Sequence, residues 1–182
     1  MTTTEMISND VKRIIKKYDT NDPVELCRIL NYNIEFSDQL PNYVKALFTI
    51  ILDRKYIMIN DRINRFFIPV LLAHELGHGI LKHELGGYHD ITVAYNPRID
   101  KKEYEANLFA AELLLDDIYV WSELHQGRTY ISLARELNVP VALMEFKLKL
   151  LSDKGYIMND IPTTQSCFLR DCNEAFTNEW FV

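Results

Sequence analysis

The sequence predicts an α+β fold in which a small antiparallel sheet packs on helices, with a helix-turn-helix-like segment toward the C-terminus. The first observation is the helical spacing of apolar residues in the first 30 residues and again after residue 100. The second is a pair of apolar runs, 47–52 and 56–60, which flank the polar residues 53–55 and indicate a β-hairpin. Because helices precede and follow this sheet, an α+β class is favoured.

Single residues mark where several elements begin and end. Residues 6–18 place apolar side chains on one side of a helix and lysines on the other. Pro23 is typical of the first turn of a second helix. Pro69 predicts the start of a long helix or a kink in it, and Gly86 and Gly87 predict its end. The predicted order is helix 6–18, a helix from Pro23, a strand at 34–36, the hairpin, a helix over 62–84, a loop over 87–97, and helices over 100–119, 130–137 and 141–153.

Composition restricts the class of protein. The 182 residues carry a net charge of −6 with a pI of about 5.4, which argues against a general binder of nucleic acids or membrane surfaces, because phosphate contacts need clustered Lys and Arg. Cys27, Cys167 and Cys172 are too few for a disulfide framework. We see no signal peptide, and no apolar run approaches the roughly 18 residues that span a bilayer. We therefore expect a cytoplasmic protein.

The strongest motif is His74-Glu75-Leu76-Gly77-His78. Histidines four residues apart stack on one face of a helix and can hold one metal ion. Glu75 then projects over the open side, where it can take a proton from metal-bound water. A chance match on a surface helix is the weaker alternative, because the preceding run 68–73 is apolar and buried histidines need polar partners. Glycine inside a helix costs about 1 kcal/mol relative to Ala, so Gly77 suggests that another backbone packs there.

The acidic helix over residues 100–117 is the candidate source of a third metal ligand. A catalytic zinc site usually has three protein ligands and one open position. At 100° per residue, Glu103 lies at the centre of the apolar face, whereas Glu105 lies on the solvent face with Glu112 and Asp116. A carboxylate on an apolar face needs a metal ion or a hydrogen-bond partner. Glu103 is therefore favoured as the ligand, and Glu105 is the less favoured alternative.

Other residues near these motifs have less definite roles. Asn107 lies one turn beyond the favoured glutamate and can orient a histidine ligand from outside the metal site. Asp100 has the spacing to form a capping box with the same glutamate, which is the alternative to a ligand role. His83 falls well round the helix from the second histidine of the motif and is predicted to lie at the surface or outside the ligand set. His89 and His125 have no assignment.

Three blocks of the sequence together match one family pattern. They are residues 72–81 around the His-Glu-x-x-His motif, residues 103–114, which are similar to the pattern Glu-x-x-Ala-Asn-x-Phe-Ala-Ala, and the looser block 131–140, which is followed by Met144 and Leu148. On these blocks the chain resembles the ImmA/IrrE family of metallopeptidases. The resemblance covers about residues 8–155, and the first two blocks together make it specific.

The resemblance implies a fold and a set of site residues. It implies a zincin-like core with metal ligands at His74, His78 and Glu103 and a general base at Glu75. Zinc is the expected metal, although two histidines and a glutamate also suit manganese or iron. The expected organisation is a metallopeptidase domain over 1–125, a helix-turn-helix-like segment over 126–158 packed on it, and a tail over 159–182.

The resemblance also implies a function. Several family members act on helix-turn-helix repressors of mobile elements or of DNA-damage responses. The expected activity is therefore hydrolysis of a peptide bond in such a repressor, with no direct contact to nucleic acid or membrane and with an open oligomeric state. The alternative is a non-catalytic, metal-containing regulator or antirepressor that acts by protein–protein binding. The intact Glu75 argues against this alternative, because a protein that only binds has no need of the base.

The contacts with a substrate are less defined. A substrate strand could pair with an exposed edge at 47–52 or 56–60, and a buried strand fits the sequence equally well. Tyr88, His89 and Tyr95 are candidates for holding the oxyanion, and nothing in the sequence selects among them. Residues 129–155 resemble a helix-turn-helix, but the second helix is mainly apolar, which favours packing or substrate docking over DNA binding.

Overall fold

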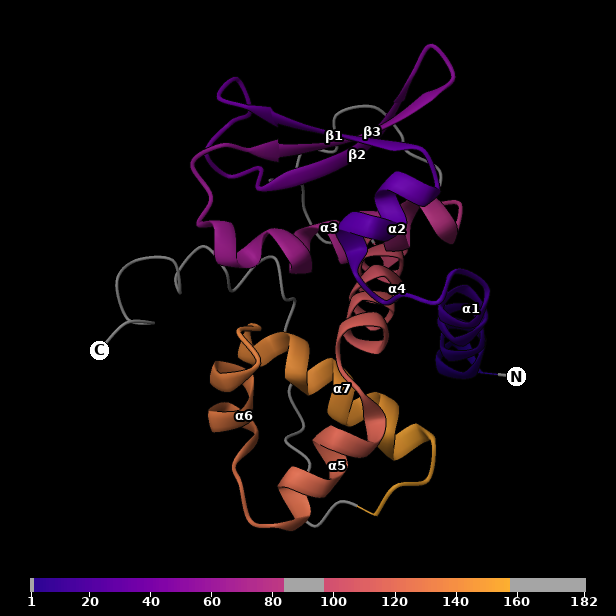
Figure 1. The fold of residues 1–182 in the computed structure, drawn as a ribbon, viewed down its shortest axis with the longest axis vertical. Helices are drawn as coiled ribbons and strands as arrows, with labels where there is room; N and C mark the ends of the chain where they lie inside the picture. Colours follow the sequence, from indigo (N-terminus) through magenta and orange to yellow (C-terminus); the bar gives the residue numbers. More distant parts are fainter. Residues whose placement is uncertain (1, 84–96, 158–182) are drawn as a thin grey trace.

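Figure 1 shows the computed structural model, which describes residues 2–83 and 97–157. The strands form one layer and the helices lie beneath it, so the predicted α+β class is confirmed. The elements are α1 (Thr3–Tyr18), α2 (Pro23–Ile29), β1 (Tyr32–Ser37), β2 (Ala46–Ile51), β3 (Arg54–Asn60), the 3-10 helix η1 (Arg65–Phe67), α3 (Ile68–Ile80), α4 (Pro97–Leu114), α5 (Asp117–His125), α6 (Tyr130–Glu136) and α7 (Val141–Asp153). Within these residues no helix has the length and apolarity needed to cross a bilayer.

Local capping explains where the first two helices begin. The side chain of Thr2 accepts a hydrogen bond from the backbone N–H of Glu5, and the Glu5 carboxylate accepts one from the backbone N–H of Thr2. This capping box starts α1 three residues before the predicted residue 6. The predicted start of α2 at Pro23 is confirmed, and the Asp22 side chain caps it by accepting a hydrogen bond from the Val24 N–H.

The sheet has the strand order β1-β3-β2. β2 and β3 are antiparallel, which confirms the hairpin, but β1 pairs parallel with β3, so the sheet is mixed and not wholly antiparallel. The turn consists of only Leu52 and Asp53, which both have positive φ (50° and 61°), as the tight turns that match strand twist require. β3 therefore begins at Arg54. In the described sheet β1 and β2 are the two edge strands, and β3 lies between them.

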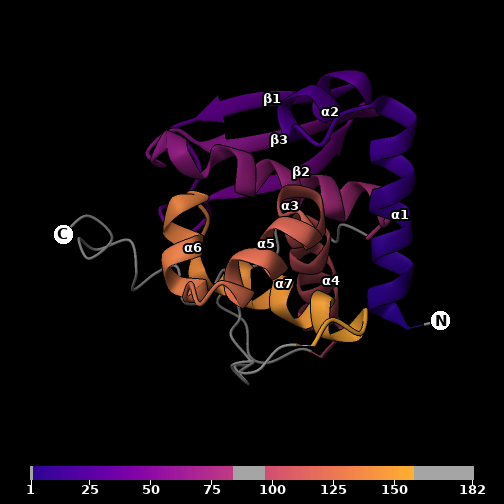
Figure 2. The same ribbon diagram turned by 60° about the horizontal axis from the view of Figure 1, so that its bottom comes forward.

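α3 lies directly under the sheet (Figures 1 and 2). Phe48, Ile57 and Ile59 point from the sheet into the core, where α3 is buried from Val70 to His78. The predicted start near Pro69 is confirmed. The predicted extension to residue 84 is wrong, because α3 ends at Ile80; Gly86 and Gly87 lie outside the described residues.

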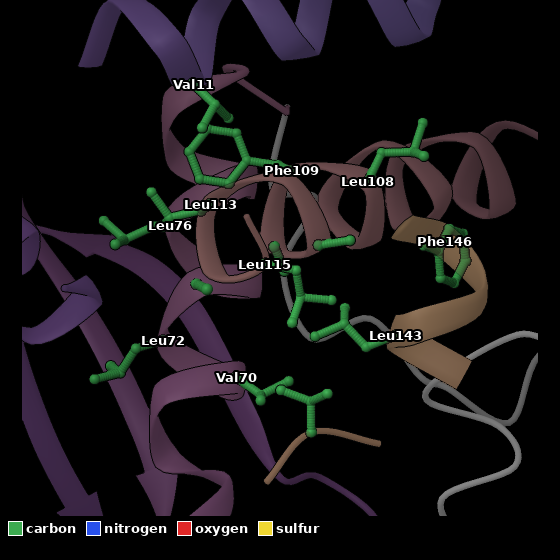
Figure 3. Packing of buried hydrophobic residues seen from close by; sticks show 14 of the residues in the cluster. Val11, Val70, Leu72, Leu76, Leu108, Phe109, Leu113, Leu115, Leu143 and Phe146 are labelled. Carbon is green, nitrogen blue, oxygen red and sulfur yellow. The ribbon is translucent and has the colours of Figure 1, made fainter. Parts of the chain in front are cut away.

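α4 crosses α3 at close range. A Cβ atom on Gly77 would lie 3.2 Å from the Cα atom of Ala106 and 3.2 Å from the Cβ atom of Phe109, which confirms that another backbone packs against this glycine. Phe109 also lies beside Leu76 and Val11 of α1 (Figure 3). α1 and α4 pack on each other, and Figure 2 shows α1 along the flank of the molecule.

The chain turns sharply after α4. α4 ends at Leu114 and does not continue to residue 119 as predicted, because Asp116 caps α5 by accepting a hydrogen bond of 2.7 Å from the Tyr119 N–H. α6 and α7 follow as predicted. Residues from both helices belong to the same hydrophobic cluster as α1, α3 and α4. The predicted domain boundary near residue 125 stays a prediction, and the tail 159–182 lies outside the described residues.

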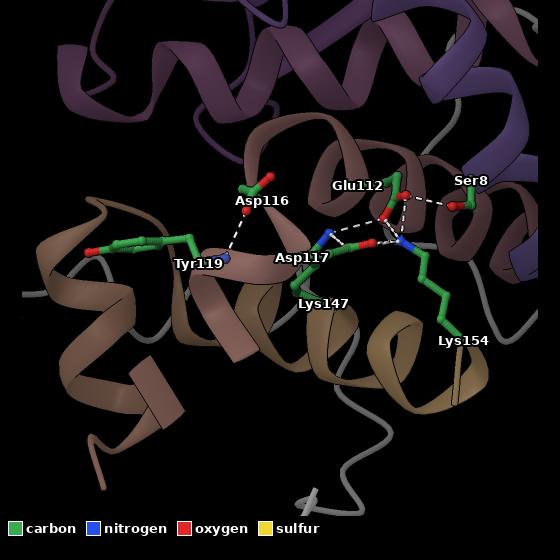
Figure 4. A network of polar contacts seen from close by, with 7 residues as sticks. All are labelled: Ser8, Glu112, Asp116, Asp117, Tyr119, Lys147 and Lys154. Atoms are coloured by element: carbon green, nitrogen blue, oxygen red, sulfur yellow. Dashed lines mark hydrogen bonds and ion pairs between the residues drawn. The ribbon is translucent and has the colours of Figure 1, made fainter. Parts of the chain in front are cut away.

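A buried network of charges joins α1, α4, α5 and α7 (Figure 4). Glu112 contacts Lys147 at 3.0 Å and Lys154 at 2.6 Å, and it accepts a hydrogen bond of 2.5 Å from Ser8. Asp117 pairs with the same two lysines. The prediction that Glu112 faces solvent is therefore wrong, because α7 brings two ammonium groups to it. Burial alone would raise the pKa of Asp117, but Lys147 and Lys154 outweigh burial and lower that pKa.

We predict that replacing the buried Lys147 causes a large loss of stability. Lys147→Ala leaves the two carboxylates with one cation, and breaking a buried pair in this way costs about 3 kcal/mol or more. Lys149→Ala on the same helix is the matched control, because its side chain is 53% exposed against 1% for Lys147, and such surface pairs contribute roughly 0.5 kcal/mol. Urea unfolding measures both. Equal losses in the two variants would contradict a central role for the network.

We also predict that the loss of stability caused by Lys147→Ala depends on pH. The folded-state pKa of Asp117 lies below its unfolded value of about 3.9. The ion pair therefore stabilises the fold fully above that unfolded pKa and is lost as the pH falls through the folded pKa. The difference in unfolding free energy between wild type and Lys147→Ala should shrink below about pH 4. A difference that grows in acid would be the wrong sign.

A second stability prediction concerns Gly79. A Cβ atom there would lie 2.2 Å from the hydroxyl oxygen of Tyr32, whose side chain is buried. Gly79→Ala gains about 1 kcal/mol of helix propensity but overpacks the core, which costs about 1–3 kcal/mol. We expect net destabilisation in thermal unfolding. The double variant with Tyr32→Leu should lose less than the sum of the single changes, and strict additivity would show that the two side chains do not collide.

Candidate metal centre

α3 and α4 bring three of the predicted site residues to one point. His74 and His78, one turn apart on α3, have their Nε2 atoms 3.0 Å from each other. Glu103 on α4 places Oε2 3.2 Å from His74 Nε2 and Oε1 3.3 Å from His78 Nε2. Both histidines are buried, whereas the Glu103 side chain is 38% exposed. The cluster is therefore enclosed on the histidine side and accessible on the glutamate side.

This arrangement fits a metal ion. The three ligand atoms lie within 4.8 Å of one another. Zinc binds imidazole nitrogen at about 2.0–2.1 Å, so tetrahedral ligands lie about 3.3 Å apart, close to the 3.0–3.3 Å found between these atoms. Glu103 Oε2 is shielded from solvent and has no hydrogen bond of good geometry. A cation between the three groups would give this oxygen a partner.

Two histidines also make contacts on the far side of their rings. His74 Nδ1 donates a hydrogen bond of 2.9 Å to Oδ1 of Asn107 on α4, in the tautomer that leaves His74 Nε2 unprotonated toward the cluster. Asn107 thus lies where the sequence predicted a residue that orients a ligand. His78 Nδ1 lies 3.0 Å from Nδ1 of His83. Both contacts are buried, which limits rotation of the rings.

Glu75 is buried beside the cluster and is held from the sheet. Its carboxylate accepts a hydrogen bond from the backbone N–H of Phe48 on β2. Burial raises the pKa of Glu75 to about 7, and the negative charge of Glu103 adds to this rise, whereas His78 and the Phe48 N–H act against it. A carboxyl group whose pKa lies near neutrality is suited to accept and then return a proton.

The charge on Glu103 is stabilised at the same place. Burial would raise its pKa, but His74 and His78 outweigh burial when they face the carboxylate as donors or cations, and they lower the pKa below its usual range. A metal ion bound between the three groups would act on Glu103 in the same direction. Glu103 therefore stays ionised while Glu75 lies close to its titration midpoint. The proposed alternative of a capping box between Glu103 and Asp100 is wrong, because α4 already begins at Pro97 and Asp100 lies inside the helix.

His83 and Glu105 form a pair that the sequence did not predict. His83 Nε2 lies 3.1 Å from Glu105 Oε2, and the Glu105 side chain is only 13% exposed, so its predicted place at the centre of a solvent face is wrong. Burial and the neighbouring His78 lower the pKa of His83, against the opposite effect of Glu105. Projecting the sequence as one continuous helix did not predict this pair, because α3 ends at Ile80 and His83 lies in the turn that follows.

The remaining candidates are distant from the cluster or are not described. His125 lies at the end of α5, where its ring packs against Trp121 with centroids 4.3 Å apart and the two planes tilted by 38°. Tyr88, His89 and Tyr95 lie outside the described residues, so their proposed contact with an oxyanion stays a prediction.

The chain has relatives among known proteins. The family model of the IrrE N-terminal-like domain, a peptidase family, matches residues 27–149, more than half of the chain. Uncharacterized immunity region protein 2 of Bacillus phage phi105 is 33% identical over 142 residues, which cover 78% of this chain and 89% of that protein. Metallopeptidase ImmA of Bacillus subtilis (strain 168) is 30% identical over 153 residues, which cover 80% of this chain and 86% of that protein. No solved structure matches significantly.

Proposed function

The chain belongs to the ImmA/IrrE family of metallopeptidases, and on this premise we propose that it is a zinc-dependent endopeptidase that cleaves a helix-turn-helix repressor. One observation carries the proposal. A buried cluster of two imidazoles and one carboxylate lies beside a second buried carboxylate, Glu75, whose pKa is raised to about 7. The residues that would hold the ion and the carboxylate that would accept the proton are thus different groups placed side by side, which suits hydrolysis at a metal site.

In this proposal His74, His78 and Glu103 hold the ion through the atoms that already face one another. When bound, the ion supplies a Lewis acid that polarises the scissile carbonyl and lowers the pKa of water to about 7. Manganese or iron would suit the same ligands. Asn107 holds the ring of His74, and the partly exposed side of Glu103 is where water and the peptide bond would approach.

Glu75 acts as the general base in the proposed reaction. Its carboxylate takes a proton from the attacking water and passes that proton to the amine that leaves. The hydrogen bond from the Phe48 N–H fixes the carboxylate while it is deprotonated. Since β2 carries Phe48, the sheet and the helix position the base together.

The substrate is proposed to bind as an extended strand along β2. Of the two strands that the sequence left open, β3 lies in the middle of the described sheet and β2 lies at its edge. An unpaired edge offers backbone donors and acceptors to a peptide. The Phe48 N–H that meets Glu75 belongs to this strand, so a peptide paired with β2 would pass the base.

A regulatory protein is the proposed substrate class. One relative is named an immunity region protein of a phage, which supports a repressor as the target. Direct DNA binding by α7 is not supported, because Lys147, one of its two lysines, is buried in ion pairs. We therefore propose that the C-terminal helices pack on the enzyme or contact the protein substrate.

Zinc should stabilise the folded chain. A ligand that binds only the native state raises the free energy of unfolding by about 2.7 kcal/mol when its concentration is 100 times Kd. We expect the Tm of the metal-free protein to rise when zinc is added, and Glu103→Ala to lose most of this rise. Glu25→Ala, which removes an exposed carboxylate of α2, is the control. A wild type whose Tm and bound metal do not respond to zinc would overturn the proposed site.

Glu75→Gln should abolish cleavage while zinc binding persists. Loss of a general base lowers rates by about 10²–10⁴-fold, and Gln keeps the size of the side chain. The assay follows cleavage of a helix-turn-helix repressor encoded next to the gene, with zinc content measured in parallel. Cleavage by Glu75→Gln at the wild-type rate would contradict the mechanism. A wild type that binds the repressor and zinc without cleaving would support the non-catalytic regulator instead.

A further inference from the structure

A chain of buried contacts leads from His78 to α4. His78 Nδ1 lies 3.0 Å from His83 Nδ1, and His83 Nε2 lies 3.1 Å from Glu105 Oε2. The two histidines meet edge to face, with ring centroids 5.1 Å apart. Lys101, one turn before Glu105 and largely exposed, approaches the other carboxylate oxygen at 3.6 Å. His83 is therefore held between a proposed metal ligand and a carboxylate.

The chemistry of these groups fixes the direction of each hydrogen bond. An ionised carboxylate can only accept, so His83 Nε2 carries the proton that it donates to Glu105. The other nitrogen of a neutral imidazole is an acceptor, so His83 Nδ1 accepts from His78 Nδ1–H. With its proton on Nδ1, neutral His78 presents a free lone pair at Nε2. That is the atom which lies beside His74 and Glu103.

The backbone after α3 explains how His83 reaches this position. Lys82 has a positive φ of 54°, and the N–H of His83 donates to the carbonyl of His78 at 3.0 Å, as in a helix C-terminus of the Schellman type. This turn folds the chain back on the last turn of α3. His83 thus contacts His78 through both its backbone and its side chain.

The two proposed histidine ligands therefore have different supports. His74 is held by a neutral amide, Asn107, whereas His78 is held by an imidazole that is itself held by a carboxylate. We propose that His83 and Glu105 are positioning residues that fix the orientation and the tautomer of His78 and thereby increase the metal affinity of the centre. This inference rests on the proposed function, because it assumes that His78 is a ligand.

The test measures zinc affinity in the full chain by competition with a chelator. His83→Phe keeps a ring but removes the acceptor, and loss of such an outer partner weakens metal binding by about 10–100-fold. Glu105→Leu removes the carboxylate and should weaken binding in the same direction, whereas Glu105→Gln keeps an acceptor oxygen and should retain most of the affinity. His125→Phe is the matched control, because it makes the same substitution at the histidine that packs against Trp121.

A second readout separates positioning from a general effect on folding. The ¹⁵N shifts of the His78 ring in the metal-free protein report its tautomer. We expect a larger share of the Nδ1–H form in wild type than in His83→Phe, at an unchanged far-UV CD spectrum. If His83→Phe does not fold, the Glu105→Leu and Glu105→Gln pair carries the same comparison with His83 in place.

The outcomes are distinct for the two proposals. Wild-type zinc affinity and an unchanged His78 tautomer in His83→Phe, or in Glu105→Leu if that pair is used, would overturn the positioning role while the metal site stands. A wild type that does not bind zinc would overturn the proposed function itself, and the positioning role with it. Equal weakening in His125→Phe would show that the effect is not specific to the His78 contact, and would also overturn it.

Discussion

The close crossing of α3 and α4 is the constraint on which the rest of the structure depends. Packed helix axes are usually about 8–10 Å apart, and small side chains allow the shorter distances. If Gly77 had a Cβ atom, that atom would lie 3.2 Å from the Cα atom of Ala106. Glu103 lies one turn before Ala106, so this close approach brings the Glu103 carboxylate within 3.2–3.3 Å of the Nε2 atoms of His74 and His78. Gly77 lowers the stability of α3 as an isolated helix. Because it has no side chain, however, it allows α4 to pack closely enough to complete the cluster.

Each polar group of the candidate centre has its partner on a different part of the fold. Glu75 is held from β2, His74 from α4, and His78 from the turn after α3. Buried polar groups are costly when unpaired and become mutually supporting when every member is paired. The geometry of the centre therefore depends on the relative placement of the sheet, α3 and α4. Of the three clustered residues, His74 and His78 are buried and Glu103 is partly exposed.

How much the sequence predicted depends on how local the information was. The motif on α3 and the choice of Glu103 over Glu105 needed only helix geometry, and the structure brings those residues together. The wheel failed for Glu105 and Glu112 because their partners, His83 and Lys147, lie 22 and 35 residues away in sequence. A wheel describes one helix and not what packs on it. The parallel pairing of β1 with β3 and the turn at Lys82 were likewise invisible to local periodicity.

The buried network around Glu112 has a consequence for the centre at the other end of α4. Glu103 and Glu112 are nine residues apart, about 14 Å along the axis and on opposite sides of the helix. One end meets the histidines of α3, and the other is clamped by two lysines at the far side. A helix of this length bends little, so α4 acts as a strut. Any rigid-body shift of α4 relative to α3 would therefore change the distances from Glu103 to His74 and His78.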